Sequence, residues 1–179
     1  MSTPVIEKNN KVNSKPVGRR QPRRRQVEKS EFDHQVMDVR RVTRVMAGGR
    51  RFSFSVTVIV GDKRGRVGVG VGKAGDTAAA IAKAINKAQK NVIKLKLTED
   101  RSIPYEVSAK FKSSKVYLQP AAGRGLIAGS SLRVVLHLAG INDVNGKFFS
   151  RAKNKLNNAQ AAILALTEFQ ENKKVTAEN

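Results

Sequence analysis

Apolar and polar residues alternate along the first half of the chain, most regularly from Phe52 to Val60. In this run Phe or Val occupies every second position, and mostly Ser or Thr lies between them. A period of two is typical of a half-buried antiparallel strand, whose successive side chains point to opposite faces. A weaker alternation covers residues 36–45, and the turn residues from Ala47 to Arg50 separate the two runs. The pattern therefore predicts a hairpin of two strands.

A third strand is predicted after the turn at residues 61–65. Three valines alternate there with three glycines, at Val67, Val69 and Val71 and at Gly68, Gly70 and Gly72. Glycines on one face of a strand leave its backbone bare, which marks the close approach of another backbone or of a ligand. We expect the valines to point inward and the glycines to point outward.

The spacing of apolar residues predicts a helix over residues 77–94, with Asp76 as its N-cap. Its apolar face steps by three and four residues, at Ala78, Ile81, Ile85, Ala88 and Val92. A lysine stripe lies on the other side, at Lys83, Lys87, Lys90 and Lys94. Such a stripe is usually a solvated face, but the absence of interleaved acids favours an anionic neighbour. Residues 32–97 are thus predicted to form a three-stranded antiparallel sheet with one helix on one face.

A polar segment ending in Pro104 marks the boundary to a second domain, predicted at residues 104–170. This domain opens with a strand pair that turns at residues 113–114, and a loop of small residues follows at 121–129. A short helix is predicted from a Ser cap at residue 130 or 131, with its end at Gly140. A last helix is predicted after an Asn cap at residue 157 or 158, and the polar residues 171–179 are expected to be a frayed tail.

The charge of the chain predicts a polyanionic partner. The sequence has 179 residues, with 35 Lys and Arg against 14 Asp and Glu, and its net charge is +21. Residues 1–30 hold nine of these basic residues and two Glu, with no periodic apolar pattern. They cannot bury enough apolar surface to offset chain entropy, so we interpret them as a disordered basic arm. A solvated tail without a partner is the alternative for this arm.

Several classes of site are disfavoured by composition. The chain has no Cys, and its two histidines, His34 and His137, lie far apart in sequence without evident carboxylate or hydroxyl partners. No thiolate metal site, cofactor or catalytic constellation is therefore expected, and the chain is predicted not to be an enzyme. No apolar run approaches the length of about 18 residues that a membrane span needs, and no secretory signal is evident. We expect an intracellular protein that does not bind membranes.

One motif favours a different function. Residues 70–75 match the G-x-G-x-x-G fingerprint of dinucleotide sites, between a strand and a helix, and Glu99 lies downstream where a ribose contact is expected. However, the preceding strand alternates Val with Gly, whereas the first strand of a doubly wound sheet is a continuous apolar run. A Walker loop is excluded because Ala74 follows Lys73 where Ser or Thr is required. A nucleotide-dependent enzyme and a free regulator of messenger RNA remain the alternative classes.

Several sequence blocks resemble signatures of the bacterial small-subunit ribosomal protein five family. They are residues 41–54 (RVTRVMAGGRRFSF), 60–62, 65–74 (GRVGVGVGKA), 119–121 and 125–129 (GLIAG). The resemblance implies an α+β fold, in which residues 32–97 are similar to double-stranded-RNA-binding modules and a C-terminal βαβ-type domain has a left-handed crossover. It also implies a cytoplasmic, ribosomal location near the messenger entry path and a contribution to decoding accuracy.

The resemblance and the charge pattern together give the candidate site residues. Those for RNA binding lie in the arm, the first hairpin and the third strand: Arg19, Arg20, Arg23, Arg24, Arg25, Arg41, Val42, Thr43, Arg44, Gly48, Gly49, Arg50, Arg51 and Lys73. Those for a protein interface are Gly123, Gly125 and Arg133. The implied partners are small-subunit ribosomal RNA, ribosomal proteins four and eight of that subunit, and messenger RNA nearby. No homo-oligomer and no metal site are expected, and residues 150–160 depart from the family pattern.

Overall fold

The computed structural model describes residues 31–95, 97 and 101–177, with side chains up to residue 168. The predicted basic arm at residues 1–30 and the boundary residues 98–100 lie outside the described residues. The disorder of the arm therefore stays a prediction.

An antiparallel sheet of four strands, in the order β1-β2-β3-β4, occupies the N-terminal half of the described chain. β1 (Asp33–Met46) and β2 (Gly49–Gly61) form a long hairpin, and β3 (Arg66–Ala74) pairs with β2. A fourth strand, β4 (Ile93–Lys94), pairs with β3. The three predicted strands are confirmed. The sheet has four strands, so the prediction of three was wrong. The sequence pattern missed β4 because two residues are too few to show an alternation.

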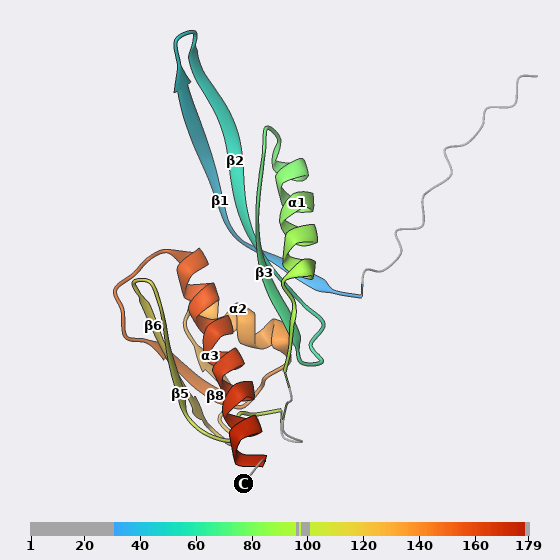
Figure 1. Cartoon of the computed structure of the whole chain (residues 1–179), viewed down its shortest axis with the longest axis vertical. Helices are drawn as coiled ribbons and strands as arrows, with labels where there is room; N and C mark the ends of the chain where they lie inside the picture. The colour runs from blue at the N-terminus through green and yellow to red at the C-terminus, as the bar shows by residue number, and fades with distance from the viewer. Residues whose placement is uncertain (1–30, 96, 98–100, 178–179) are drawn as a thin grey trace, which may run out of the picture.

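One helix, α1 (Thr77–Lys90), covers one face of this sheet (Figure 1). Val56, Val58 and Val60 of β2 pack there against the alanines of α1. The buried residues of the helix are Ala80, Ala84 and Ala88, and Ala78 is exposed. The predicted apolar face is therefore rotated, because the backbone of α1 comes so close to the glycines of β3 that only its alanines fit against the sheet. Asp76 is the N-cap, as predicted, although its side chain makes no capping hydrogen bond.

The glycines of β3 face α1, so the prediction that they point outward was wrong. A Cβ built on Gly70 would lie 2.2 Å from the carbonyl oxygen of Ala84 and 2.4 Å from the backbone nitrogen of Ala88. Gly68 and Gly72 meet the helix backbone as closely. The glycine pattern predicted the close approach of either another backbone or a ligand. The structure shows the first of these, the backbone of α1.

The β1–β2 hairpin extends past the end of the rest of the sheet (Figure 1). The pairing of β2 with β3 runs from Phe54 to Gly61, whereas its pairing with β1 continues to Met46 and Gly49. Residues 42–53 therefore form a two-stranded ribbon with no third strand beside it, closed by a two-residue turn at 47–48. We call these residues the ribbon.

A second sheet, in the order β5-β6-β8-β7, occupies the C-terminal half. β5 (Val107–Phe111) and β6 (Ser114–Pro120) form the predicted strand pair, with the turn one residue earlier than expected. β7 (Leu126–Ala128), α2 (Ser130–Ala139) and β8 (Val144–Phe148) form a βαβ unit, because β7 and β8 pair in parallel. The residue pattern did not predict β7 or β8, which are short and have a glycine within or beside them.

In the C-terminal half both helices start at other residues than predicted, whereas one helix end is confirmed. Gly129 is the N-cap of α2, not a serine, and Gly140 ends the helix with a positive φ of 82°. α3 (Lys155–Ala177) begins after Asn154, whose side-chain oxygen accepts a hydrogen bond from the backbone N–H of Leu156. Asn158, a predicted cap, is buried inside the helix and accepts a hydrogen bond from Ser114. α3 also continues through residues 171–177, where a frayed tail was expected.

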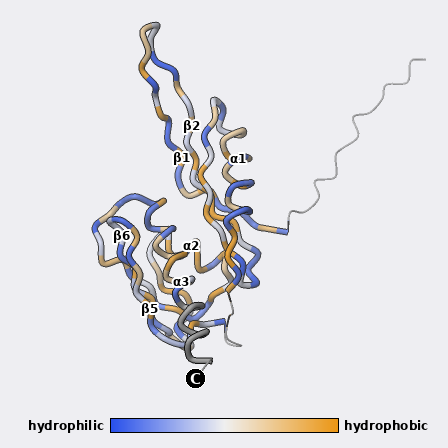
Figure 2. The backbone as a smooth tube through the Cα atoms, viewed as in Figure 1, coloured by the Kyte–Doolittle hydropathy of each residue, from blue (hydrophilic) through white to orange (hydrophobic). Residues whose placement is uncertain are grey.

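The two halves share one hydrophobic core. Ile59, Val67 and Val69, on the face of the first sheet away from α1, belong to the same buried cluster as the apolar side chains of α2, α3 and the second sheet. The layers are thus α1, the first sheet, the helices α2 and α3, and the second sheet. In Figure 2 the strands where the halves meet are largely orange, whereas the ribbon carries blue stretches. β2 is buried on both faces from Val56 onward, not half-buried as its alternation predicted.

Candidate nucleic-acid interface

The ribbon presents arginines on both of its faces. Arg44 of β1 lies opposite Arg51 of β2, so the two side chains leave the same face, the one turned away from α1. Arg50 lies opposite Val45 on the other face. All three arginines are exposed, and none of them forms an ion pair with a residue in the described part of the chain. Like charges directly opposite on a sheet are destabilising, so this arrangement favours an anionic partner.

Aromatic and apolar side chains accompany these arginines. The alternation of the predicted strand places Phe52 on the same face as the buried Val56, but Phe52 is 48% exposed, because α1 does not extend as far as the ribbon. The guanidinium of Arg41 lies over its ring, 4.5 Å from the centroid. Val45, beside the turn, is 75% exposed. The ribbon therefore offers cations and apolar surface together, which suits a folded nucleic acid better than a small anion.

The remaining RNA-binding candidates lie at the end of β3, at the tip of the ribbon, on β1 and in the arm. Lys73 is exposed at the end of β3, opposite Ser55, on the same sheet face as Arg44 and Arg51. Gly48 and Gly49 lie at the tip, where an added Cβ would meet nothing within 4 Å, and Gly49 has a positive φ of 119°. The tip backbone is thus open to a close neighbour. Val42 and Thr43 lie on the β1 side of the ribbon, and Arg19–Arg25 lie outside the described residues.

A second basic surface follows α1. Three lysines of the predicted stripe, Lys83, Lys87 and Lys90, are exposed on α1. Lys94 is exposed as well, but it lies on β4, so the prediction that the helix continues to residue 94 was wrong. No ion pair joins these lysines to an acid among the described residues.

The ion pairs of the described residues gather at the root of the hairpin. Asp62 is only 4% exposed and accepts hydrogen bonds from the Arg66 side chain, at 2.5 Å, and from the backbone N–H groups of Arg64 and Arg66. Burial raises the pKa of Asp62, but these hydrogen bonds outweigh burial and hold the pKa below its ordinary value. Lys63 pairs with Asp33 at 2.8 Å, and its hydrogen bond holds the pKa of Asp33 low as well.

The two histidines, far apart in sequence, line one open cavity of about 420 Å³ together with Asp33 and Lys63. Both histidines are exposed. No group of three or more residues able to hold a metal ion occurs among the described residues. The Asp33 carboxylate at this cavity is already paired with Lys63.

The loop of small residues lies at the start of the βαβ unit. Gly123 and Gly125 have positive φ values of 72° and 69°, and an added Cβ on either would meet nothing within 4 Å. Asp143 fixes this loop, because its side chain accepts a hydrogen bond from the backbone N–H of Gly125 at 3.1 Å. Arg133 of α2 is exposed and donates a hydrogen bond to the carbonyl oxygen of Leu126. The structure therefore brings the three predicted interface residues to one end of the C-terminal half.

The glycine fingerprint is not arranged as a dinucleotide site. β3 lies in an antiparallel sheet, and Gly70 and Gly72 are covered by the backbone of α1. A dinucleotide site needs a parallel strand and an open helix N-terminus above these glycines. Among the described residues, no helix is long and apolar enough to span a membrane.

Sequence reasoning missed the outer face of the second sheet. Lys110, Lys115 and Lys147 are exposed there around Tyr117 and Phe149. Alternation of lysines with buried residues along β5 and β6 was the available signal.

Comparison with known proteins agrees with the resemblance that the sequence blocks suggested. Residues 32–96 match the family model of the N-terminal domain of ribosomal protein S5, and residues 109–179 match that of its C-terminal domain. The small ribosomal subunit protein uS5 of Prochlorococcus marinus (strain AS9601) is 40% identical over 178 residues, which cover 99% of this chain and 86% of that protein. The protein uS5c of Emiliania huxleyi is 44% identical over 140 residues, covering 78% of this chain and 87% of the relative. The chain therefore belongs to the ribosomal protein S5 family.

Proposed function

We propose that this chain is a structural constituent of the small ribosomal subunit and binds its ribosomal RNA through the ribbon. The family consists of ribosomal components rather than enzymes. The observation that carries the RNA contact is the projection of unpaired arginines beyond the rest of the fold, at Arg44, Arg50 and Arg51. Projection lets these cations reach into a folded RNA while the packed body stays outside it.

Binding would be dominated by phosphate neutralisation and shape. Arginine forms bidentate hydrogen bonds with phosphate oxygens, and release of counterions makes such binding strongly salt-dependent. The glycines of β3 take no part, because α1 covers them. Close backbone approach to the RNA is instead available at the tip, at Gly48 and Gly49. Folded RNA is recognised mainly in this way, through its shape and backbone.

Finer features of the proposed function follow from the family resemblance. The arm at residues 1–30 adds phosphate contacts, and Gly123, Gly125 and Arg133 face ribosomal protein four, with protein eight and the messenger entry path nearby. The chain acts in the cytoplasm as part of the ribosome and supports subunit assembly and decoding accuracy. The likeness of residues 32–97 to double-stranded-RNA-binding modules and the left-handed crossover stay predictions.

The experiment compares two arginines of one strand. Arg44→Ala removes an unpaired cation, whereas Arg40→Ala removes a cation from the same strand face that already pairs with Asp38 at 2.5 Å. Binding of the full chain to small-subunit ribosomal RNA is measured over a range of salt concentrations. The logarithm of the binding constant falls as the logarithm of the salt concentration rises. We expect this negative slope to become shallower by about 0.7–0.9 in Arg44→Ala, the value for one lost phosphate contact. The Arg40→Ala slope should stay near that of the wild type, and thermal stability should be kept in both variants.

Equal slopes for the wild type and Arg44→Ala would contradict the role of the ribbon. Sedimentation of cell extracts separates the alternative of a free messenger regulator, because a subunit constituent travels with small subunits in stoichiometric amount. A nucleotide-dependent enzyme would instead bind a dinucleotide or ATP with an affinity that survives high salt.

A further inference from the structure

The outer face of the second sheet carries lysines around two aromatic rings. Its inner face packs on α3, with Val107, Leu118 and Val144 in the core. The outward positions alternate with these buried ones along β5, β6 and β8. We call this outer face the lysine–aromatic face; its central residues are Lys110, Lys115, Tyr117, Lys147 and Phe149.

The strand register fixes the layout of this face. Tyr117 of β6 lies opposite Lys147 of β8, and Lys115 of β6 lies opposite Lys110 of β5. The backbone N–H of Phe149 donates to the carbonyl oxygen of Lys115, which continues the pairing by one residue. The rings of Tyr117 and Phe149 are 5.8 Å apart between centroids and tilted by 58°. Each ring therefore has a lysine of the neighbouring strand beside it.

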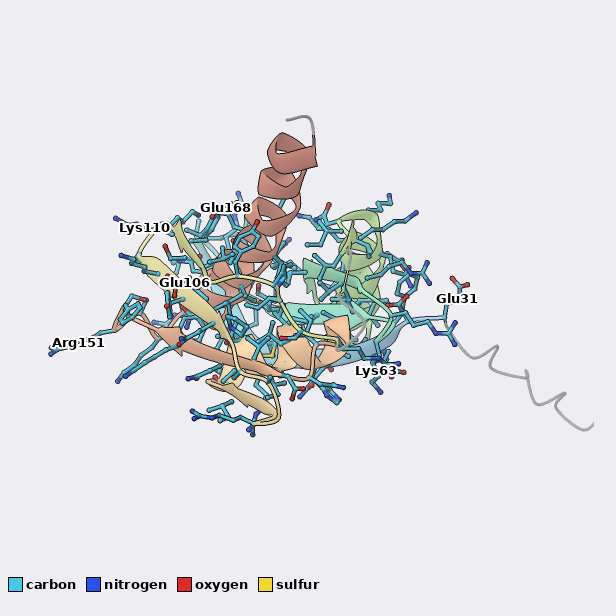
Figure 3. All side chains as sticks on the ribbon, turned by 90° about the horizontal axis from the view of Figure 1, so that it is seen from below. Glu31, Lys63, Glu106, Lys110, Arg151 and Glu168 are labelled. Atoms are coloured by element: carbon cyan, nitrogen blue, oxygen red, sulfur yellow. The ribbon has the colours of Figure 1, made fainter. Side chains whose placement is uncertain are left out.

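The charges of this face are unbalanced. β5, β6 and β8 contain no acidic residue. Glu106, just before β5, accepts a hydrogen bond from the hydroxyl of Tyr117, and this bond raises the pKa of Tyr117. Figure 3 shows Lys110 and Arg151 projecting from the same side of the molecule. Lys110 and Lys115 face each other directly, an unfavourable pairing of like charges that a bound anion would relieve.

The aromatic rings distinguish the anion that fits. Phe149 is 62% exposed, more than any other phenylalanine side chain that the structure describes. A free phosphate gives an exposed ring no partner, whereas an unpaired base stacks on it while the neighbouring phosphates reach lysines. An RNA duplex presents its bases edge-on within the helix, and so it would leave the ring face unused.

We propose that the lysine–aromatic face binds a single-stranded segment of RNA, with a base stacked on Phe149 beside Tyr117 and phosphates at Lys110, Lys115 and Lys147. This inference rests on the proposed function, since it adds a second RNA site to the one at the ribbon. The ribbon would hold folded RNA by shape, and the lysine–aromatic face would hold an unpaired strand by stacking.

The test uses the full chain and fluorescent oligouridine of about 12 nucleotides, a length that one single-strand-binding fold can cover. Phe149→Ala should weaken binding on the order of 10-fold, the usual effect of removing one stacking ring. The matched control is Ile127→Ala on β7, because Ile127 is 50% exposed on the same sheet face but has no lysine opposite it. That control should bind as the wild type does.

Lysine variants test the charge separately. Replacing Lys110, Lys115 and Lys147 by Gln should make the negative slope of log K against log salt shallower by about 2. This value corresponds to three phosphate contacts at about 0.7 each on a single strand. The same replacement of Lys83, Lys87 and Lys90 on α1 removes equal charge and serves as the control. Equal losses in both triple variants, or an unchanged affinity of Phe149→Ala, would overturn the proposal.

Two further outcomes distinguish this inference from the proposed function of the ribbon and from a protein interface on the same face. If Arg44→Ala weakens binding to small-subunit RNA while Phe149→Ala changes neither RNA, the ribbon function stands and the lysine–aromatic face does not. If Phe149→Ala keeps oligouridine binding but loses a cross-link to a neighbouring protein in assembled subunits, the face is a protein interface, and the proposal of an RNA strand is refuted.

Discussion

Replacing Gly70 with alanine should destabilise the protein, because the new methyl group has no space. Its Cβ would lie 2.2 Å from the carbonyl oxygen of Ala84, 2.4 Å from the backbone nitrogen of Ala88 and 2.9 Å from the Cα of Ala88. All three atoms belong to the backbone of α1, so no side-chain rotation relieves the contact. The helix has to move away from β3, and this movement loosens the packing of its buried alanines on the sheet.

The expected loss is about 3 kcal/mol, the upper part of the range for overpacked cores, because a backbone cannot yield as a side chain does. For a chain of this length, each kcal/mol lowers the melting temperature by about 2–4 °C, so Gly70→Ala should melt about 6–12 °C below the wild type. Gly75→Ala is the matched control. An added Cβ on Gly75 meets nothing within 4 Å, and its φ is not positive, so its effect should stay within about 0.5 kcal/mol.

Thermal unfolding followed by circular dichroism measures both variants, and RNA affinity is measured in parallel below the melting temperature. The two possible orientations of the β3 glycines predict opposite results. If the glycines face α1, stability falls. A Gly70→Ala variant as stable as Gly75→Ala, but with weakened RNA binding, would refute the packing argument and place these glycines at the RNA.

Three other variants test the root of the hairpin and the small-residue loop. Asp62→Asn should lose about 1.5–3 kcal/mol at pH 7, the value of hydrogen bonds to a charged group. The lowered pKa of Asp62 gives stability above the ordinary carboxyl value near 4 and loses it as the pH falls through the folded-state value, so the variant should show a shallower decline in melting temperature on acidification. Gly140→Ala combines a positive φ of 82° with a Cβ 2.2 Å from the carbonyl oxygen of Lys63; we expect a loss of about 2–4 kcal/mol in chemical denaturation, and an unchanged midpoint would contradict the contact between the halves. Gly125→Arg has open space, so it should cost only about 1–2 kcal/mol for its positive φ and still assemble, while raising misreading in a near-cognate reporter; wild-type error rates would disprove the proposed role in decoding.

The strands of the N-terminal half could be predicted because a period of two is a local property of the sequence. The predicted hairpin, third strand and helix all occur, and the N-cap Asp76 and the helix end at Gly140 are where the sequence places them. Which layer covers each face is not a local property. The orientation of Gly68, Gly70 and Gly72 was therefore wrong, since it depends on where α1 and the C-terminal half pack.

In the candidate site, too, local features could be predicted from the sequence, whereas features that depend on packing could not. Exposure of Arg44, Arg50 and Arg51 was predictable, because they flank a glycine turn at the end of an alternating run. The exposure of Phe52 was not, since its position in the run matches that of the buried Val56 and only the reach of α1 distinguishes them. The lysine–aromatic face was missed because it joins residues from three strands, and the sequence pattern gave no β8.

The distribution of acids explains how so basic a chain can both fold and bind RNA. In the described residues the ion pairs involve Asp33, Asp38 and Asp62, all at the root of the hairpin or where the two halves meet. Lys155 of α3, for example, reaches the backbone carbonyl oxygen of Met37 and the carboxylate of Asp38. Except for the pair of the buried Asp62 side chain with Arg66, these pairs are exposed and contribute little stability, about 0–1 kcal/mol each, so their main effect is on where charge remains. Because the acids neutralise cations at the junction, the positive field is concentrated on the ribbon, the outer face of α1 and the lysine–aromatic face, where a polyanion can approach without disturbing the contacts that hold the two halves together.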